Sequence, residues 1–358
     1  MSSSASDNGN LLQQPLILSK ASAPADSMRV VAIGGGTGLS TLLRGLREHV
    51  TPAGLYAKPR IISDLAAVVT VTDDGGSSGR LRQGFNMLPP GDLRNCMLAL
   101  SEEEDLLAQL FAHRFRGGDA LKGHNFGNLF VAALTEITGD FARAIQLASK
   151  ILAARGRIYP VTTANATLVA HMDDGTVVRG ETNITASHRR IVELALDPPD
   201  AAPLQETLDA IERANLITVG PGSLYTSLIT NLLVDGIPSA LASARGIRVF
   251  ICNLMTQANE SLGLTASQHI ERIYEHTRAP IFDCALVNTA PFSAETLARY
   301  AAEGAYPIEA DIERVQALGV RCIAGNFASE DSVVRHEPDR VTDALLALGR
   351  TRGAVQTA

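Results

Sequence analysis

An apolar run that ends in three consecutive glycines is the feature that most constrains the fold of this chain. The stretch VVAIGGGTGLSTLLRGL, residues 30–46, reads as a strand over 28–34, a glycine-rich turn and an amphipathic helix over 39–49. Continuous apolar runs are typical of strands buried on both faces of a parallel sheet. Because such runs alternate with helical patterns along the chain, we expect an α/β fold with a doubly wound, mainly parallel sheet and helices on both faces.

The other patterns divide the 358 residues into one domain with a tail at each end. Residues 1–27 are rich in Ser, Ala, Gln and Asn and predict a disordered tail, and residues 351–358 a C-terminal tail. Residues 28–350 read as a single α/β domain with a small β-rich insertion over about 157–187, where Asp-Gly at 174–175 predicts a hairpin. We expect further strands at 65–74, 215–220, 247–253, 280–288 and 320–325, and helices within 89–115, 125–138, 140–156 and 339–350.

Composition and charge exclude several classes of partner. The net charge of −7 disfavours binding to nucleic acid or to anionic lipid. No apolar run approaches the roughly 18 residues that a membrane-spanning helix needs. The four cysteines are far apart and form no CxxC pair, which favours reduced thiols. With no secretory pattern at the N-terminus, these features predict a cytoplasmic protein.

The glycine turn is the first candidate anion site. Glycines allow backbone N–H groups to approach an anion closely, and a helix N-terminus adds partial positive charge. The turn Gly35, Gly36, Thr37 and Gly38 matches neither the GxGxxG dinucleotide pattern nor the P-loop, which requires a lysine. We expect it to hold a phosphate, with a purely structural tight turn as the alternative.

The segment TVTDDGGSSGRLR, residues 70–82, is the most informative stretch. We expect Asp73 and Asp74 to end a buried strand and point into the same crevice as the glycine turn. A tight loop should follow, in which Gly75, Ser77, Ser78 and Arg80 approach a phosphate. The two carboxylates suit Mg²⁺ binding, with Asp74 as the candidate ligand, or acceptance of sugar hydroxyls, or general-base work. The alternative is that Asp73 or Asp74 only caps the next helix.

Polar residues later in the chain extend this candidate site. Asn125 and Asn128 lie three residues apart at a predicted helix start. Gly220, Gly222 and Ser223 form a second junction with the same arrangement as the first turn, in which a strand, glycines and a helix follow one another. Asn253 ends another strand and is a neutral hydrogen-bonding group that suits a base or sugar. Asp92 reads as a helix N-cap. His269 and His276 read as an exposed helix face.

Six ordered blocks carry a resemblance to a known family. GGGTGLSTLLRGL, VTVTDDGGSSGRLR, MLPPGDLRNC, GHNFGNL, GPGSLYTS and CNLMTQ resemble the YvcK-like branch of the CofD-like family, the gluconeogenesis factors, over about residues 28–330. The resemblance implies a Rossmann-like fold and a crevice for UDP-sugars such as UDP-N-acetylglucosamine or UDP-glucose. It also implies a cytoplasmic role, with protein partners, that links carbon metabolism to cell shape and wall synthesis. A homo-oligomer, in particular a dimer, is in keeping with the family. Gln268 departs from the pattern, which has an acid there.

Three functions follow from these observations. The first is a non-catalytic UDP-sugar sensor that acts on protein partners. The second is a Mg²⁺-dependent CofD-type transferase, which moves a phospholactyl-like group from a nucleoside diphosphate carrier. The third, a nicotinamide-dependent oxidoreductase, rests on fold analogy alone and is disfavoured by the broken GxGxxG pattern.

Overall fold

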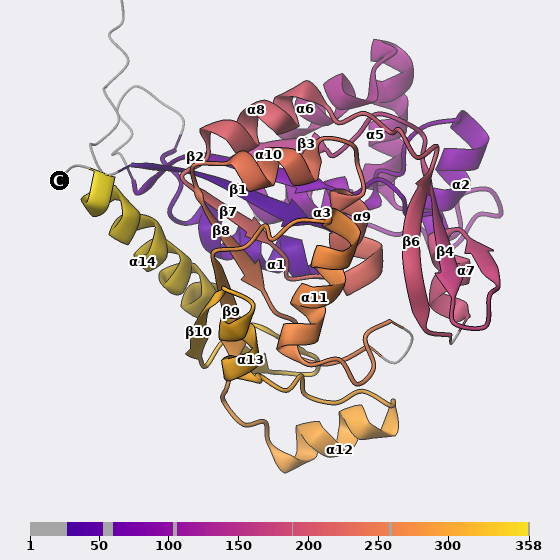
Figure 1. Ribbon diagram of the computed structural model, residues 1–358. Helices are drawn as coiled ribbons and strands as arrows, with labels where there is room; N and C mark the ends of the chain where they lie inside the picture. Colours follow the sequence, from indigo (N-terminus) through magenta and orange to yellow (C-terminus); the bar gives the residue numbers. More distant parts are fainter. Residues whose placement is uncertain (1–26, 53–59, 103–105, 188, 258–259, 357–358) are drawn as a thin grey trace, which may run out of the picture.

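The structure is a computed structural model that describes residues 27–52, 60–102, 106–187, 189–257 and 260–356. The N-terminal tail expected over 1–27 lies outside the described residues except for Ser27. The chain folds around a central sheet that is covered by helices on both faces (Figure 1). The expected doubly wound α/β fold is confirmed.

The central sheet has seven strands, all parallel, in the order β10-β9-β8-β7-β1-β2-β3. This is the Rossmann order extended by one strand, because the chain winds outward from β1 to β3 and then restarts on the other side of β1. The strands are β1 (Met28–Gly34), β2 (Ile62–Val69), β3 (Arg157–Pro160), β7 (Leu216–Val219), β8 (Ile247–Ile251), β9 (Cys284–Asn288) and β10 (Arg321–Gly325). The point at which the strand order reverses therefore lies between β1 and β7, and ligands of such sheets bind at that point.

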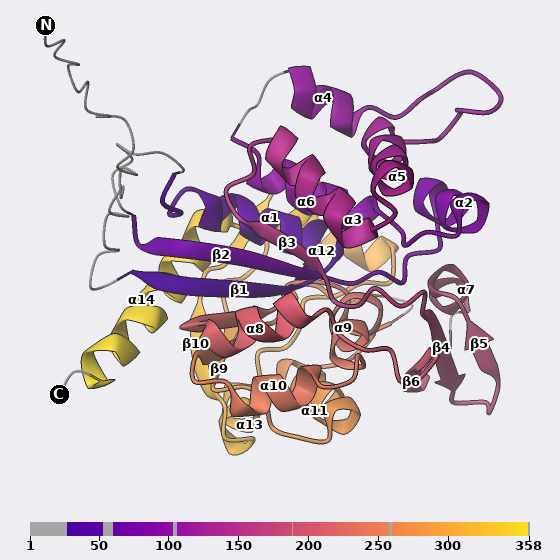
Figure 2. The same cartoon turned by 90° about the horizontal axis from the view of Figure 1, so that it is seen from above.

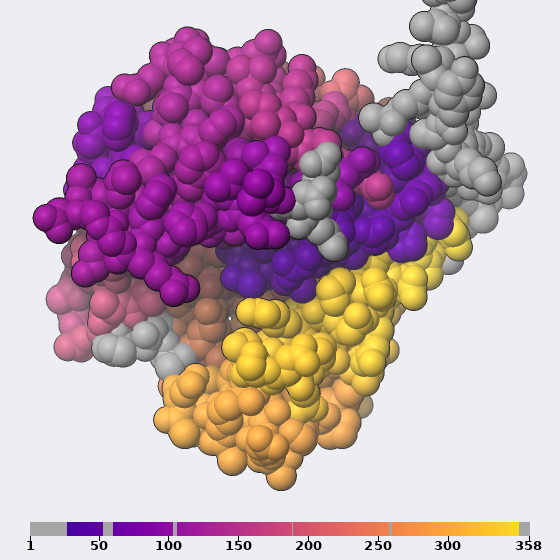
Figure 3. Space-filling view, turned by 180° about the vertical axis from the view of Figure 1, so that it is seen from behind, coloured from indigo at the N-terminus to yellow at the C-terminus, as the bar shows by residue number. Residues whose placement is uncertain are grey.

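Helices on both faces complete the layers. Figure 2 shows α1, α3 and α6 on one side of β1–β3, and α8 and α10 on the other. The longest helix, α14, packs against α1, and Figure 3 shows this C-terminal segment in yellow beside the indigo N-terminal part. The helices are α1 (Gly36–Arg47), α2 (Gly76–Phe85), α3 (Gly91–Leu100), α4 (Leu106–Ala112), α5 (Phe126–Thr138), α6 (Phe141–Ile151), α7 (Glu181–Ala186), α8 (Gln205–Arg213), the π-helix η1 (Leu224–Ile229), α9 (Thr230–Leu232), α10 (Ile237–Ser243), α11 (Ala266–Thr277), α12 (Ala294–Ala302), α13 (Ile312–Ala317) and α14 (Pro338–Gln356).

The predicted β-rich insertion exists but its bounds differ. A separate antiparallel sheet in the order β5-β4-β6 is built from β4 (Thr167–Met172), β5 (Val177–Arg179) and β6 (Ile191–Asp197). The strand at 157–160 is instead the edge of the main sheet, and the small sheet continues beyond 187 to β6. A second small sheet is the hairpin of β11 (Ala328–Glu330) and β12 (Val334–His336).

Several expected elements are wrong in their type or length. The second strand ends at Val69 rather than at residue 74, so Asp73 and Asp74 lie in the connection that follows it. The expected loop after these acids is helix α2. The helix expected within 89–115 is two helices, α3 and α4. The last helix runs from 338 to 356 rather than 339 to 350, so it enters the expected C-terminal tail.

Candidate functional site

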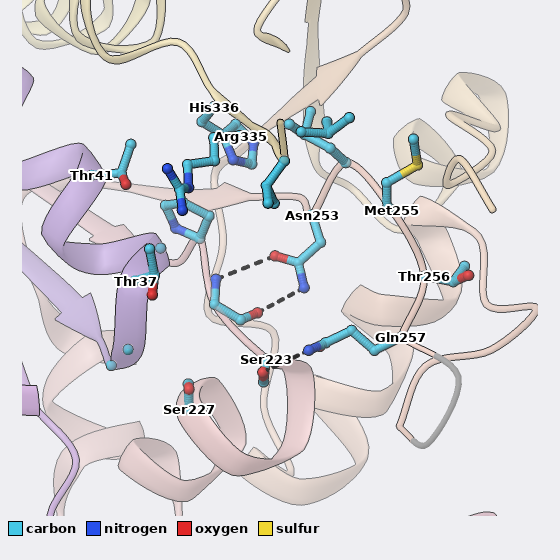
Figure 4. Close-up of a pocket in the computed structure, with 18 of the residues that line it drawn as sticks. Thr37, Thr41, Ser223, Ser227, Asn253, Met255, Thr256, Gln257, Arg335 and His336 are labelled. Atoms are coloured by element: carbon cyan, nitrogen blue, oxygen red, sulfur yellow. Dashed lines mark hydrogen bonds between the residues drawn. The ribbon is translucent and has the colours of Figure 1, made fainter. Parts of the chain in front are cut away.

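A cleft of about 420 Å³ lies at the point where the strand order reverses. The turns after β1 and β7, two neighbouring strands, form one side of it, and the segment after β8 and the β11–β12 hairpin form the other (Figure 4). Its lining residues are Gly35, Gly36, Thr37, Gly38, Thr41, Pro221, Gly222, Ser223, Ser227, Asn253, Leu254, Met255, Thr256, Gln257, Tyr300, Val333, Val334, Arg335 and His336. Seven of the predicted site residues are therefore brought together here: Gly35, Gly36, Thr37, Gly38, Gly222, Ser223 and Asn253.

The first glycine turn needs its glycines for two different reasons. Gly36 has φ +61°, a conformation that side chains with a Cβ rarely adopt. At Gly38, a Cβ would stand 2.4 Å from the carbonyl oxygen of Pro221, which shows that the two turns touch. The close contact fixes both turns against each other on one side of the cleft.

The second turn is held by Asn253. Its Oδ1 accepts the N–H of Gly222 at 3.2 Å, and its Nδ2 donates to the Gly222 carbonyl at 2.7 Å. Both polar groups of this amide therefore hold the turn, which makes Asn253 a residue that shapes the cleft. Gln257 donates to the hydroxyl of Ser223 at 2.9 Å and ties the same turn to the segment after β8 (Figure 4).

Two cleft residues, Arg335 and His336, were missed by the sequence analysis. They lie on β12, a strand of three residues that is too short to show an alternating pattern of apolar and polar residues. The Arg-His pair itself was therefore the only feature of the sequence that pointed to them. Arg335 is exposed and its charge contributes, after burial, to lowering the pKa of Arg44 on α1. Within the described part of the chain, its guanidinium has no ion-pair partner closer than 4.0 Å. Arg335 is thus free to pair with a ligand anion.

His336 presents a hydrogen-bond acceptor to the cleft. Its Nε2 lies 3.1 Å from the carbonyl oxygen of Cys252 and must carry the proton, because a carbonyl can only accept. Burial lowers the pKa of His336 to about 4, so the ring is neutral near pH 7. The neutral ring with a protonated Nε2 leaves Nδ1 as an acceptor.

The carboxylate of Asp92 already occupies the start of α1. The predicted N-cap role of Asp92 is wrong, because α3 begins at Gly91 and is preceded by Pro90. Instead Asp92 Oδ2 accepts the N–H of Gly36 at 2.7 Å. Burial raises the pKa of Asp92 to about 6, the Gly36 bond opposes this rise, and the charge of Asp73 adds to it. A ligand phosphate at this turn would meet a carboxyl group that is ionised above about pH 6.

Glu260 likewise accepts a backbone N–H at a helix start, next to the second glycine turn. Its Oε1 accepts the hydroxyl of Thr226 at 2.9 Å and its Oε2 the N–H of Tyr225 at 3.2 Å, at the N-terminus of η1. Burial raises the pKa of Glu260, and these hydrogen bonds work against that rise. Both helix N-termini that the sequence marks as anion sites thus carry an internal carboxyl group.

A third partly buried acid, Glu181, comes from the insertion. It opens α7, and its Oε2 accepts the hydroxyl of Thr72 at 3.2 Å. Burial first, and then the charges of Asp73 and Asp92, raise its pKa to about 8. Asp73, Asp92 and Glu181 therefore form one acidic group beside the first glycine turn, and Glu181 is protonated at neutral pH.

The other predicted residues lie outside the lining of the cleft. Asp74 accepts the N–H and hydroxyl of Thr182 at 2.9 and 2.6 Å, so it bonds the start of α7 rather than that of α2, the next helix along the chain. Ser77 is buried, with its Oγ 3.2 Å from His124 Nδ1 and from the N–H of Asn125. The remaining residues of this group are Gly75, whose N–H is bonded to Asp73, the buried Ser78, Arg80, which donates to Lys122, and Gly220, whose N–H donates to Ile33.

Asn125 and Asn128 serve the helix they open. Asn125 accepts the N–H of Asn128 at 3.1 Å and donates to the Ala112 carbonyl at 3.0 Å, so both ends of its amide bond within the protein. Asn128 is buried and its Oδ1 has no hydrogen-bond partner. The expectation of an exposed face at His269 and His276 is also wrong, because His269 is 1% exposed and His276 accepts the N–H of Leu194.

Among the described residues, no group of three or more His, Cys, Asp or Glu side chains is arranged to hold a metal ion. Nor does any helix in the described ranges combine the length and apolarity needed to cross a bilayer.

Known proteins similar to this chain identify its family. Residues 30–328 match the family described as 2-phospho-L-lactate transferase CofD. A gluconeogenesis factor from Halalkalibacterium halodurans is 46% identical over 329 residues, covering 91% of this chain and 98% of that protein. The gluconeogenesis factor of Bacillus subtilis is 43% identical over 321 residues, covering 89% of this chain and 98% of that protein. A crystal structure of a UPF0052 family member from Bacillus halodurans has a TM-score of 0.84 at 45% identity, covering 90% of this chain and 99% of that one. The chain therefore belongs to the CofD family and, within it, to the gluconeogenesis factors.

Proposed function

We propose that the cleft binds a nucleotide sugar, UDP-N-acetylglucosamine or UDP-glucose, with its diphosphate between the two glycine turns and Arg335. The observation that carries this proposal is an arginine without an ion-pair partner in the described structure, placed across the cleft from two backbone turns (Figure 4). A guanidinium offers several N–H donors in a fork that matches phosphate oxygens. Thr37 adds a hydroxyl at the first turn.

The neutral groups of the cleft suit the rest of such a ligand. Gln257 is exposed at the mouth, and His336 offers the acceptor Nδ1. Acceptors and amides of this kind recognise the polar edge of a base or the hydroxyls of a sugar. The acidic group Asp73, Asp92 and Glu181 beside the first turn could accept further sugar hydroxyls.

We further propose that the protein is a regulator rather than an enzyme. Its relatives are named gluconeogenesis factors, which supports a role in growth on gluconeogenic carbon sources. In this role the nucleotide sugar reports the state of carbon metabolism, and the bound protein acts on partners that control cell shape and wall synthesis. We expect it to work as a homo-oligomer in the cytoplasm.

Calorimetric titration of the full chain tests the ligand. UDP-N-acetylglucosamine, UDP-glucose, GDP and NAD are compared, each with and without Mg²⁺. We expect a UDP-sugar to bind best, and Arg335→Gln to weaken that binding by roughly tenfold to a hundredfold, the effect of losing a charged hydrogen bond. The matched control is Arg314→Gln, an exposed arginine outside the cleft, which should change nothing. Equal affinity of the wild-type protein and Arg335→Gln would refute the proposed site.

The same samples separate the sensor from the transferase. After incubation with each nucleotide, the mixture is analysed for cleavage products. Intact UDP-sugar supports the sensor. A preference for GDP that requires Mg²⁺, together with group transfer, would favour the transferase and would give Asp74, the candidate Mg²⁺ ligand, a role to test by Asp74→Asn.

A further inference from the structure

A hairpin-shaped connection between α4 and α5 carries charges that the cleft does not use. The Phe115 N–H donates to the His124 carbonyl at 2.9 Å, and the Gly123 N–H donates back to Phe115 at 2.8 Å. Figure 2 shows this connection extending from the end of α4 to the start of α5. It also approaches α2, since Ser77 contacts both His124 and Asn125.

Two arginines converge on this hairpin. Arg80 Nη2 donates to the carbonyl of Lys122 at 3.0 Å, and Arg114 Nη1 donates to the carbonyl of Gly123 at 2.8 Å. The two guanidiniums are thus fixed to consecutive carbonyl groups by one nitrogen each, and their other nitrogens are left for another acceptor. Gly123 has φ +80°, and a Cβ there would stand 3.2 Å from Arg80 Nη2, so glycine makes room for the guanidinium.

Neither guanidinium has a carboxylate within 4.0 Å among the described residues. Asp119, on the same hairpin, is exposed and makes no ion pair with them. The pKa of His124 is lowered first by burial and then by the charges of Arg80 and Arg114. Burial and the two arginines thus favour the uncharged form of the His124 ring.

A third arginine, Arg94, lies close enough to Arg114 for their charges to interact. Arg94 is 9% exposed, and its Nε and Nη1 are buried without a hydrogen-bond partner. Burial first, and then the charge of Arg114, lowers its pKa to about 10, while Asp92 and Asp73 oppose the fall. A buried guanidinium with two unused donors next to a second cation is an unfavourable arrangement that a bound anion would relieve.

We propose that Arg80 and Arg114 form a second binding site, for the phosphate group of a small phosphate monoester. Two guanidinium forks set against one glycine call for a group with two negative charges and several acceptor oxygens, which a phosphate monoester supplies and a single carboxylate does not. None of the three arginines lines the nucleotide cleft. The second site can therefore hold its ligand while a nucleotide is bound. In this proposal the protein responds to two metabolites.

The test uses the full chain and two probes, inorganic phosphate and glycerol 3-phosphate, in calorimetric titrations. We expect one site per chain and at least a tenfold weaker affinity in the double variant Arg80→Gln with Arg114→Gln. The matched control is Arg116→Gln, an exposed arginine of the same hairpin, which should bind like the wild-type protein. Tighter binding of the monoester than of inorganic phosphate would identify an organic phosphate as the ligand; the reverse order would identify free phosphate.

Other variants test the second site if the double variant does not fold, and they separate it from the nucleotide cleft. Should the double variant fail to fold, Arg80→Lys with Arg114→Lys retains both charges but loses the forks, and weaker phosphate binding by a folded Lys variant supports the site. Arg335→Gln should weaken nucleotide binding and leave phosphate binding unchanged, so failure of the proposed nucleotide function leaves this result intact. Phosphate binding that is equal in the wild-type protein and the arginine variants, or lost only in Arg335→Gln, overturns the proposal. So does binding of a phosphopeptide or RNA at this hairpin with no small-molecule phosphate bound.

Discussion

At the scale of single residues, the carboxyl group of Asp92 governs how well the first glycine turn accepts a phosphate. Its oxygen takes the N–H of Gly36, the donor that a phosphate would use, and above about pH 6 it carries a negative charge there. Asp92→Asn keeps an oxygen acceptor for Gly36 and removes the charge. We expect the variant to bind the diphosphate ligand about tenfold more tightly at about pH 8, a gain of about 1.4 kcal/mol.

The pH dependence of this gain provides its own control. Below about pH 5 the carboxyl group of the wild-type protein is protonated, so the affinities of wild-type and Asp92→Asn should converge. Calorimetric titration of both proteins across this range measures the gap. A gap of the opposite sign, with the variant binding more weakly at about pH 8, would show that the ligand or its cation needs the negative charge.

At the scale of elements, the contact between the two glycine turns holds the cleft in shape. A Cβ at Gly38 would lie 2.4 Å from the carbonyl oxygen of Pro221, and backbone on both sides leaves no flexible side chain to move aside. We expect Gly38→Ala to lower the free energy of unfolding by about 1–3 kcal/mol, as overpacking does, and to weaken ligand binding at least tenfold. Urea unfolding and calorimetric titration measure the two effects.

Gly84 offers the matched control on another helix. A Cβ there meets nothing within 4 Å, and Gly84 lies inside α2. Gly84→Ala should stabilise the protein by roughly 0.5–1 kcal/mol through helix propensity and leave binding unchanged. If Gly38→Ala behaved like Gly84→Ala, the two turns would be able to separate without loss, and the contact between them would have no part in binding.

The sequence predicts the elements well where one local pattern decides them. Both glycine turns and their flanking strands follow from apolar runs that end in glycine. Helix α2 was missed because GGSSGRLRQG is rich in glycine and serine, which read as loop, whereas burial of Ser77, Ser78 and Leu81 makes the segment helical. The strand over 65–74 was predicted too long because Thr70, Val71 and Thr72 are buried β-formers that leave the sheet before the acids.

At the scale of the whole molecule, the site joins segments whose relation no local pattern encodes. Arg335 lies near α1 only because the β11–β12 hairpin folds back over the cleft, and Glu181 reaches Asp92 only because the insertion packs beside the sheet. Asp92 was read as a cap because its true partner, Gly36, is 56 residues away. Polar contacts of this range depend on the packed fold, so sequence patterns predict the turns but not the acids and cations that surround them.

The buried acids also make the stability of the whole molecule depend on pH. Glu181 has a pKa of about 8 in the folded protein against an ordinary value of 4.5. Between these values the unfolded chain loses a proton that the folded protein keeps. Its contribution to the free energy of unfolding therefore falls by about 1.4 kcal/mol for each pH unit of rise, and is constant below and above that window.

Glu181→Gln removes this titration while keeping the acceptor for Thr72. We expect the free energy of unfolding of the variant to rise relative to that of the wild-type protein by roughly 1.4 kcal/mol per pH unit between about pH 5 and about pH 7. Urea unfolding of both proteins at matched ionic strength measures this difference. The control is Glu271→Gln, at an exposed glutamate on α11. Its free energy of unfolding should depend on pH as that of the wild-type protein does. The same pH dependence in Glu181→Gln would mean that Glu181 is ionised in the folded protein, so that its charge adds to those of Asp73 and Asp92 beside the first glycine turn.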